Sequence, residues 1–70
     1  MLAKKSFTLS GHRTSVALEP EFWAVLQQSA RARGIALAAL VDEIDTGRGA
    51  RPLASALRLH ALAANGAMPS

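Results

Sequence analysis

The sequence predicts a mainly α-helical fold in which one short β-strand precedes two core helices and a third C-terminal helix. Three observations lead to that prediction. Polar and apolar residues alternate over residues 13–18, as in a half-buried strand. An amphipathic pattern then runs from Pro20 to Gly34, and a second one follows over residues 37–45. The chain has only 70 residues, yet 50% of them are hydrophobic, which is more apolar surface than so small a monomer readily buries. We therefore expect one domain over residues 1–70 that completes its sheet and its core as a homodimer.

The expected strand presents two different faces, because successive side chains in a strand point to opposite sides. Val16 and Leu18 face the core, whereas Arg13, Ser15 and Ala17 face outward. A single strand cannot satisfy its own hydrogen bonds, so we expect it to pair antiparallel with the same strand of a second subunit.

The residues before this strand carry weaker signals. Residues 1–5 are expected to be a flexible arm, and residues 5–9 alternate only weakly, with Phe7 and Leu9 on one side. Ser10 and Gly11 predict a turn or a bulge.

The first helix is expected over residues 20–33. Pro20 suits the first helical position, where its missing N–H costs nothing, and Glu21 places negative charge at the positive end of the helix dipole. Gly34 is suited to the left-handed conformation that ends many helices. The inner face of this helix has the spacing i, i+3, i+4 and i+7, with the apolar residues Phe22, Val25 and Leu26 followed by Ser29. Trp23 lies beside the stripe, where packing is favoured over stacking on a nucleic-acid base.

Two further helices are expected, over residues 37–45 and 52–64. The second helix has an apolar stripe, and its opposite face carries the acidic residues Asp42, Glu43 and Asp45. The third helix is apolar around most of its circumference, which again favours burial against a partner subunit. Residues 66–70 are expected to be a frayed tail. The apolar residues that we assign to the dimer core are Val16, Leu18, Phe22, Leu26, Leu40, Val41, Ile44 and Leu57.

The charge is unevenly distributed along the chain. The formal net charge is +3, and Lys4, Lys5 and Arg13 lie in the first thirteen residues with no acid among them. This asymmetry favours one positive face, the electrostatic signature of a nucleic-acid-binding protein, over a uniformly solvated surface.

Other classes of chemistry find little support. The chain has no cysteine, so neither a disulfide nor a thiolate metal site is expected. His12 and His60 lie in separate segments, so we expect no metal site; His12 is interpreted as a turn residue or phosphate contact, and His60 as a satisfied interface histidine. No serine has a recognisable base beside it. We expect no enzymatic activity, no catalytic residue and no cofactor. No stretch is long enough to cross a membrane, and no signal peptide is evident, so a cytoplasmic location is expected.

Residues 13–44 resemble the ribbon-helix-helix superfamily of the Arc and MetJ repressors. The match consists of the strand T-S-V-A-L, the helix start E-P-E-F, and R-G-I-A-L-A-A-L-V across the inter-helix turn. A narrower motif, G-H-R-T-S-V-A-L-E-P-E-F-W at residues 11–23 together with L-A-S-A-L-R at residues 53–58, is similar to that of a family of small bacterial ribbon-helix-helix domain proteins.

The resemblance implies a homodimer whose two-stranded ribbon enters the major groove of double-stranded DNA. The implied DNA-binding residues are Lys4, Lys5, His12, Arg13, Ser15 and Ala17. The resemblance also implies phosphate contacts from the backbone of Ala36, Leu37 and Ala38 at the start of the second helix. Ala36 stands where family members often carry a capping hydroxyl, so that cap is lost.

Two functions follow from this interpretation. The first is a homodimeric, DNA-binding transcriptional regulator. The alternative is a dimeric protein–protein adaptor on the same fold with little DNA affinity. Two features favour this adaptor: the modest charge, and the small set of possible base-reading residues, Arg13, Ser15 and Ala17. An antitoxin would normally need a tail that wraps its toxin, and too few residues follow the third helix, unless that helix is itself the partner surface.

Overall fold

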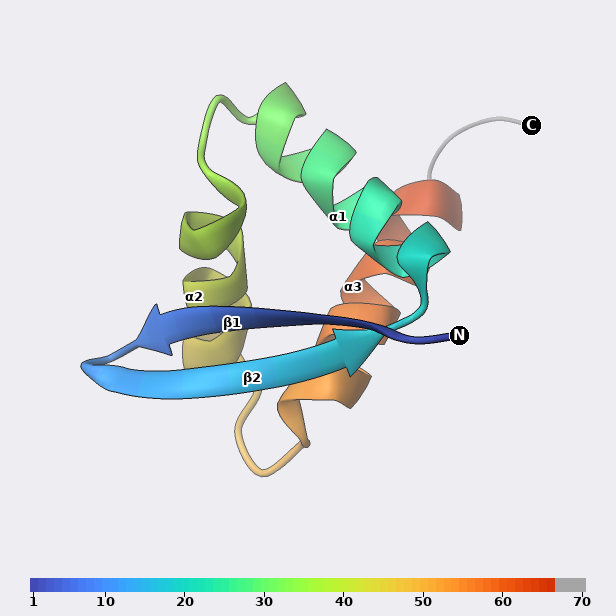
Figure 1. Ribbon diagram of the computed structural model, residues 1–70. Coiled ribbons are helices and arrows are strands. Elements are labelled where there is room, and N and C mark those ends of the chain that lie inside the picture. Colours follow the sequence, from blue (N-terminus) through green and yellow to red (C-terminus); the bar gives the residue numbers. More distant parts are fainter. Residues whose placement is uncertain (67–70) are drawn as a thin grey trace.

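The computed structural model describes residues 1–66, with side-chain surroundings for residues 1–64. Its elements are the strands β1 (Ala3–Leu9) and β2 (His12–Leu18), followed by the helices α1 (Pro20–Ala32), α2 (Leu37–Gly47) and α3 (Leu53–Gly66). Figure 1 shows the two strands crossing in front of α2 and α3, with α1 lying above the strands. The predicted ribbon-helix-helix fold with a third C-terminal helix is therefore confirmed.

The ribbon differs from the prediction in the origin of its second strand. β2 pairs antiparallel with β1 of the same chain, in a register that runs from Ala3 opposite Leu18 to Leu9 opposite His12. The expected flexible arm over residues 1–5 is thus wrong for Ala3, Lys4 and Lys5, which belong to β1. The predicted frayed tail lies outside the described residues, apart from Gly66, which ends α3.

A two-residue turn joins the strands and explains why they pair within the chain. Ser10 and Gly11 both have positive φ angles, of 52° and 81°. This is the signature of a type I′ turn, whose twist matches that of a β-hairpin. The sequence signal for a turn was correct, and the weak alternation of residues 5–9 is that of a genuine strand.

The helices begin and end close to their predicted positions. Pro20 is the first residue of α1, and the chain leaves the helix through Gly34, which has a φ of 70°. Ile35 N–H then donates to the carbonyl of Ala30, closing the turn that leads into α2. The predicted second helix extends two residues further, to Gly47.

One core is shared by both strands and all three helices. Its fully buried side chains are Leu18, Leu26, Leu40, Val41 and Leu57. Val16 is also buried, and Phe22 and Ile44 pack against the core while remaining partly exposed. All eight residues assigned to the dimer core therefore belong to the core of a single chain. Their burial needs no partner, and their place in a dimer remains a prediction.

Candidate nucleic-acid interface

The outer face of the β1–β2 sheet is built by strand alternation. The register places one set of side chains toward the helices and the other set away from them. Leu9, Val16 and Leu18 are buried on the helix side. The outer face carries Lys4, Ser6, Thr8, Arg13, Ser15 and Ala17.

The outer face is polar and cationic. Thr8 lies opposite Arg13 in the register, and the hydroxyls of Ser6 and Ser15 are hydrogen-bonded to each other across the strands at 2.9 Å. All of its residues are exposed except Ala17, which is partly buried. Neither strand contains an acidic residue, so the charges of Lys4 and Arg13 meet no counter-charge on this face.

Three of the arginines outside the strands are neutralised by ion pairs. Within the described part of the chain, Arg33 pairs with Glu43 at 2.9 Å, Arg48 with Asp45 at 2.7 Å, and Arg58 with Glu19 at 3.0 Å. Lys4 and Arg13 make no ion pair among these residues, so their charge is available to an external anion.

Glu19, at the junction of β2 and α1, is held in its charged form. A backbone hydrogen bond at Glu19 and the hydrogen bond from the Arg58 guanidinium lower the pKa of this carboxyl below its ordinary value of 4.5. The ion pair joins the end of the ribbon to α3.

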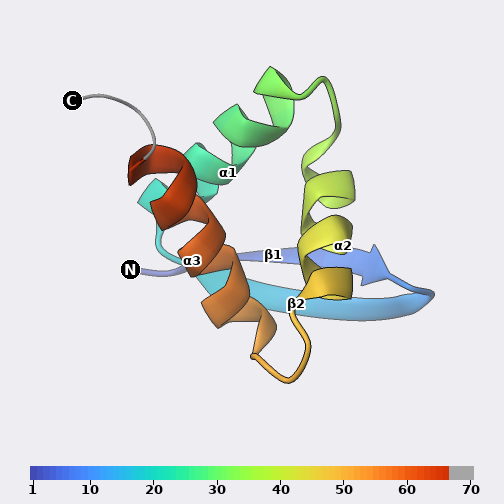
Figure 2. The ribbon, with the colours of Figure 1, turned by 180° about the vertical axis from the view of Figure 1, so that it is seen from behind.

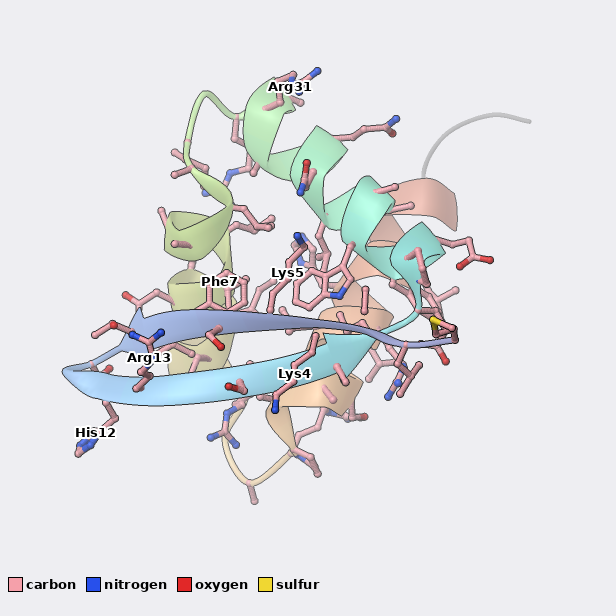
Figure 3. All side chains as sticks on the ribbon, in the orientation of Figure 1. Lys4, Lys5, Phe7, His12, Arg13 and Arg31 are labelled. Atoms are coloured by element: carbon pink, nitrogen blue, oxygen red, sulfur yellow. The ribbon has the colours of Figure 1, made fainter. Side chains whose placement is uncertain are left out.

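Lys5 does not belong to the outer face. Figure 3 shows Lys5 and Phe7 directed toward the helices, whereas Lys4 and Arg13 point away from them. The Lys5 ammonium lies 5.9 Å from the centroid of the Trp23 ring, within cation–π range. The prediction that Lys4 and Lys5 act from one side is therefore wrong, because neighbouring residues in a strand point to opposite faces.

Trp23 is a packing residue, as predicted, although more deeply buried than expected. It is 3% exposed, and its ring packs obliquely against that of Phe7, with 5.8 Å between the ring centroids. Its Nε1 donates a 2.7 Å hydrogen bond to the Ala3 carbonyl. It is not available to stack on a base.

His12 lies at the tip of the hairpin, where it is exposed and projects from the end of the sheet (Figure 3). The register assigns it to the helix-facing set, opposite Leu9, so it does not lie on the outer face. Its position agrees with the interpretation of His12 as a residue beside the turn.

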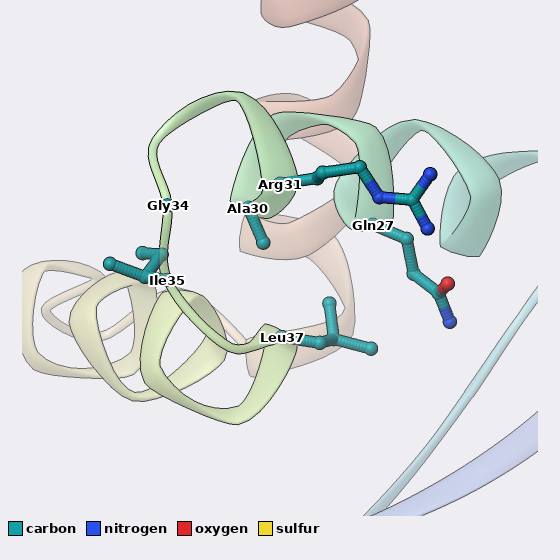
Figure 4. Close-up of a pocket in the computed structure, with 6 residues that line it drawn as sticks. All are labelled: Gln27, Ala30, Arg31, Gly34, Ile35 and Leu37. Atoms are coloured by element: carbon teal, nitrogen blue, oxygen red, sulfur yellow. The ribbon is translucent and has the colours of Figure 1, made fainter.

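The start of α2 offers the backbone groups expected of a phosphate contact. Ala36 occupies the N-cap and makes no side-chain capping bond, as predicted. Its carbonyl accepts from the N–H groups of Ala39 and Leu40, whereas the N–H groups of Leu37 and Ala38 have no acceptor within the helix. A shallow hollow of about 340 Å³ borders this helix end, and Gln27 and Arg31 of α1 extend beside it on the side to which Leu37 points (Figure 4).

The structure does not bring this helix end into the outer face of the sheet. The N-terminal end of α2 is the end that lies far from the strands, and the helix then runs down behind them (Figures 1 and 2). Ala36, Leu37 and Ala38 are thus separated from Lys4 and Arg13.

The second edge of β2 is unpaired, because the sheet of the described residues contains only two strands. In a two-residue hairpin the flanking pair, here Leu9 and His12, is hydrogen-bonded, and bonded pairs then alternate with non-bonded ones. The backbone groups of Arg13, Ser15 and Ala17 therefore point away from β1, toward this free edge.

Ser6 and Thr8 are the members of the outer face that the sequence interpretation missed. Both lie in residues 5–9, whose alternation is weaker than that of β2. The signal was present in the alternation of K-S-F-T-L before Ser-Gly, with Phe7 and Leu9 on one face and Ser6 and Thr8 on the other.

Other kinds of site are not evident in the described residues. They include no group of three or more histidine or acidic side chains placed to hold a metal ion. None of the helices in this part of the chain combines the length and apolar character needed to cross a membrane.

Comparison with known families decides the classification. The model of the ribbon-helix-helix domain matches residues 2–64, nearly the whole chain. The protein belongs to the ribbon-helix-helix family. Domains of this family are in general DNA-binding regulators of transcription rather than enzymes. The match supports the superfamily, and the narrower bacterial motif remains a prediction. Searches of the curated proteins and of the solved structures found no match.

Proposed function

We propose that this ribbon-helix-helix protein is a homodimeric, DNA-binding transcriptional regulator that applies the outer face of its sheet to the major groove. The observation that supports this proposal is the exposed outer face, on which Lys4 and Arg13 stand without an acidic partner. In a bacterium such a protein would act in the cytoplasm, where the DNA lies.

The outer face offers a direct reading chemistry. The Arg13 guanidinium has the fork geometry that pairs with the O6 and N7 atoms of guanine. The hydroxyl of Ser15 can donate to or accept from several bases, and the methyl group of Ala17 suits a thymine methyl. The hydroxyls of Ser6 and Thr8 on β1 can donate to phosphate oxygens.

The free edge of β2 is the proposed dimer seam. A second β2 strand pairing there about a two-fold axis would use the outward N–H and C=O groups of Arg13, Ser15 and Ala17. Neighbouring strands lie about 4.8 Å apart, so two central β2 strands fit a groove that is about 12 Å wide. The two flanking β1 strands would then bring Lys4 close to the phosphates at the groove walls.

The DNA-binding function is tested by measuring the affinity for random and genomic duplexes by fluorescence anisotropy over a range of salt concentrations. Lys4 and Arg13 from two subunits supply four charges, so the log–log slope should be on the order of −3 to −4. Arg13→Ala should weaken binding and relax any base preference, whereas Lys4→Ala should weaken all sequences alike. Absence of duplex binding at tens of micromolar protein and low salt would overturn this function.

A proline substitution tests the dimer seam. Ser15→Pro removes a backbone N–H from the free edge of β2 without removing a backbone hydrogen bond to β1, so it should yield a folded monomer by size-exclusion chromatography with light scattering. Like its control, it also removes the hydroxyl bond between Ser6 and Ser15. Ser6→Pro is the matched control, because it removes the corresponding N–H from the free edge of β1. If both variants remain dimeric, the seam lies elsewhere.

The adaptor function is supported by a different observation. Leu59 and Leu62 are large apolar side chains that are 45% and 55% exposed on α3. The adaptor function is better supported than the DNA-binding function if the wild-type protein dimerises but binds no duplex.

A further inference from the structure

A second hollow lies away from the proposed DNA interface. It is formed by the C-terminal part of α2, the loop that follows, and α3, and it has a volume of about 480 Å³. These elements lie on the helix side of the sheet, and Figure 2 shows the loop connecting α2 to α3. The residues that give the hollow its chemistry are Ile44, Arg48, Arg51, Ala56, Leu59 and His60.

Two arginines line this hollow, and only one of them has a guanidinium group that is free to bind an anion. Arg48 Nε donates to Asp45 Oδ1 at 2.7 Å, and its Nη1 donates to the Arg51 carbonyl at 2.7 Å, so Arg48 is both neutralised and fixed in place. Arg51 is exposed and makes no ion pair within the described residues. The hollow thus has the charge to accept a single negative group.

The other side chains that line the hollow are those of Ile44, Ala56, Leu59 and His60. Ile44 and Ala56 are largely covered, and Leu59 presents an exposed side chain at the rim. His60 Nε2 is buried and has no hydrogen-bond partner among the described residues, contrary to the expectation of a satisfied histidine. Buried polar atoms are normally paired, so an unpaired one beside a hollow points to a missing partner.

We propose that this hollow binds a small organic monocarboxylate with an apolar body. The carboxylate would accept the bidentate hydrogen bonds that guanidinium groups form with this group, from Arg51. The apolar body would lie against Ile44 and Leu59, where binding removes exposed leucine surface from water. His60 lines the same hollow, so its ring would lie beside the bound ligand. This proposal does not depend on DNA binding.

The test uses octanoate as the probe and NMR spectroscopy of the full chain. Octanoate should produce saturable shifts in the amides of residues 48–51 and 59–60 and in the His60 ring. Octanamide, which has the same apolar body without the charge, should bind about tenfold more weakly, because it cannot form the charge-assisted pair.

Two pairs of variants make the test specific. Arg51→Gln should weaken octanoate binding about tenfold, whereas Arg31→Gln, an exposed arginine of α1, should leave it unchanged. Leu59→Ser should weaken binding, whereas Leu62→Ser, which changes the other exposed leucine of α3, should not. The proposal is overturned if no saturable shifts appear, if octanamide binds as tightly as octanoate, or if both members of a pair behave alike.

Discussion

Trp23 Nε1 donates a hydrogen bond of 2.7 Å to the carbonyl oxygen of Ala3, twenty residues earlier in the chain. This bond joins the first strand to the first helix at the point where the sheet begins. It explains why the start of the chain is ordered as a strand, since the alternation of residues 5–9 alone is a weak signal.

Replacing Trp23 with Phe should destabilise the protein by about 1–3 kcal/mol, because it removes this donor, leaves the Ala3 carbonyl without its partner and reduces ring volume. Urea denaturation followed by circular dichroism measures the effect. Phe7→Leu is the comparison, since Phe7 packs on the same ring without a hydrogen bond. Unchanged stability in Trp23→Phe would show that the bond does not hold the strand.

The two neighbouring lysines should have separate effects. Lys5→Ala should lower stability by about 0.5–1 kcal/mol through loss of its contact with the Trp23 ring, and should leave DNA affinity unchanged. Lys4→Ala should weaken DNA binding and leave the melting temperature unchanged. Equal effects of the two substitutions on DNA affinity would contradict the assignment of the faces.

Leu57 should contribute strongly to folding, because it is fully buried where α3 meets the other elements. Leu57→Ala should cost about 2–5 kcal/mol in the free energy of unfolding. Leu62→Ala on the same helix should change it by less than about 0.5 kcal/mol, since the Leu62 side chain is largely exposed. Similar losses in the two variants would mean that α3 packs differently.

Acid should weaken the link between Glu19 and Arg58. The pKa of Glu19 is lower in the folded protein than its ordinary value of 4.5, so the stabilisation is complete above that value and is lost as the pH falls through the lowered pKa. Glu19→Gln should therefore reduce stability at neutral pH and remove this part of its acid dependence. Thermal melts between about pH 2 and 7 provide the measurement, with Glu21→Gln as the control. An unchanged pH profile in Glu19→Gln would rule out this role.

The helices could be predicted closely from sequence because their signals are local. Pro20 and Gly34 mark the ends of α1, and the stripe of Leu40, Val41 and Ile44 marks the inner face of α2. The pairing of the strands was harder to predict, because an unpaired strand can be completed by a second chain or by an earlier segment of its own. The turn at Ser10 and Gly11 favours pairing with the earlier segment of the same chain.

The candidate site was predictable in part for the same reason. Arg13, Ser15 and Ala17 were placed outward correctly from the alternation of β2. Lys5 differs, because the charge along the chain does not show that Lys4 and Lys5, as neighbours in β1, face opposite sides of the sheet. The unpartnered nitrogen of His60 could not be predicted, since it depends on how α2, α3 and their loop pack together.

The two-residue connection between β1 and β2 also has a kinetic consequence. A ribbon made from two separate chains forms only when the chains meet, so its rate depends on protein concentration. Here the strands are neighbours in sequence, and hairpins of this kind form in about 1–10 μs. Contacts that are close along the chain also favour fast folding. Refolding of the sheet after dilution from denaturant should therefore proceed at a rate that does not change with protein concentration, and any concentration-dependent phase should report only the later association of folded chains.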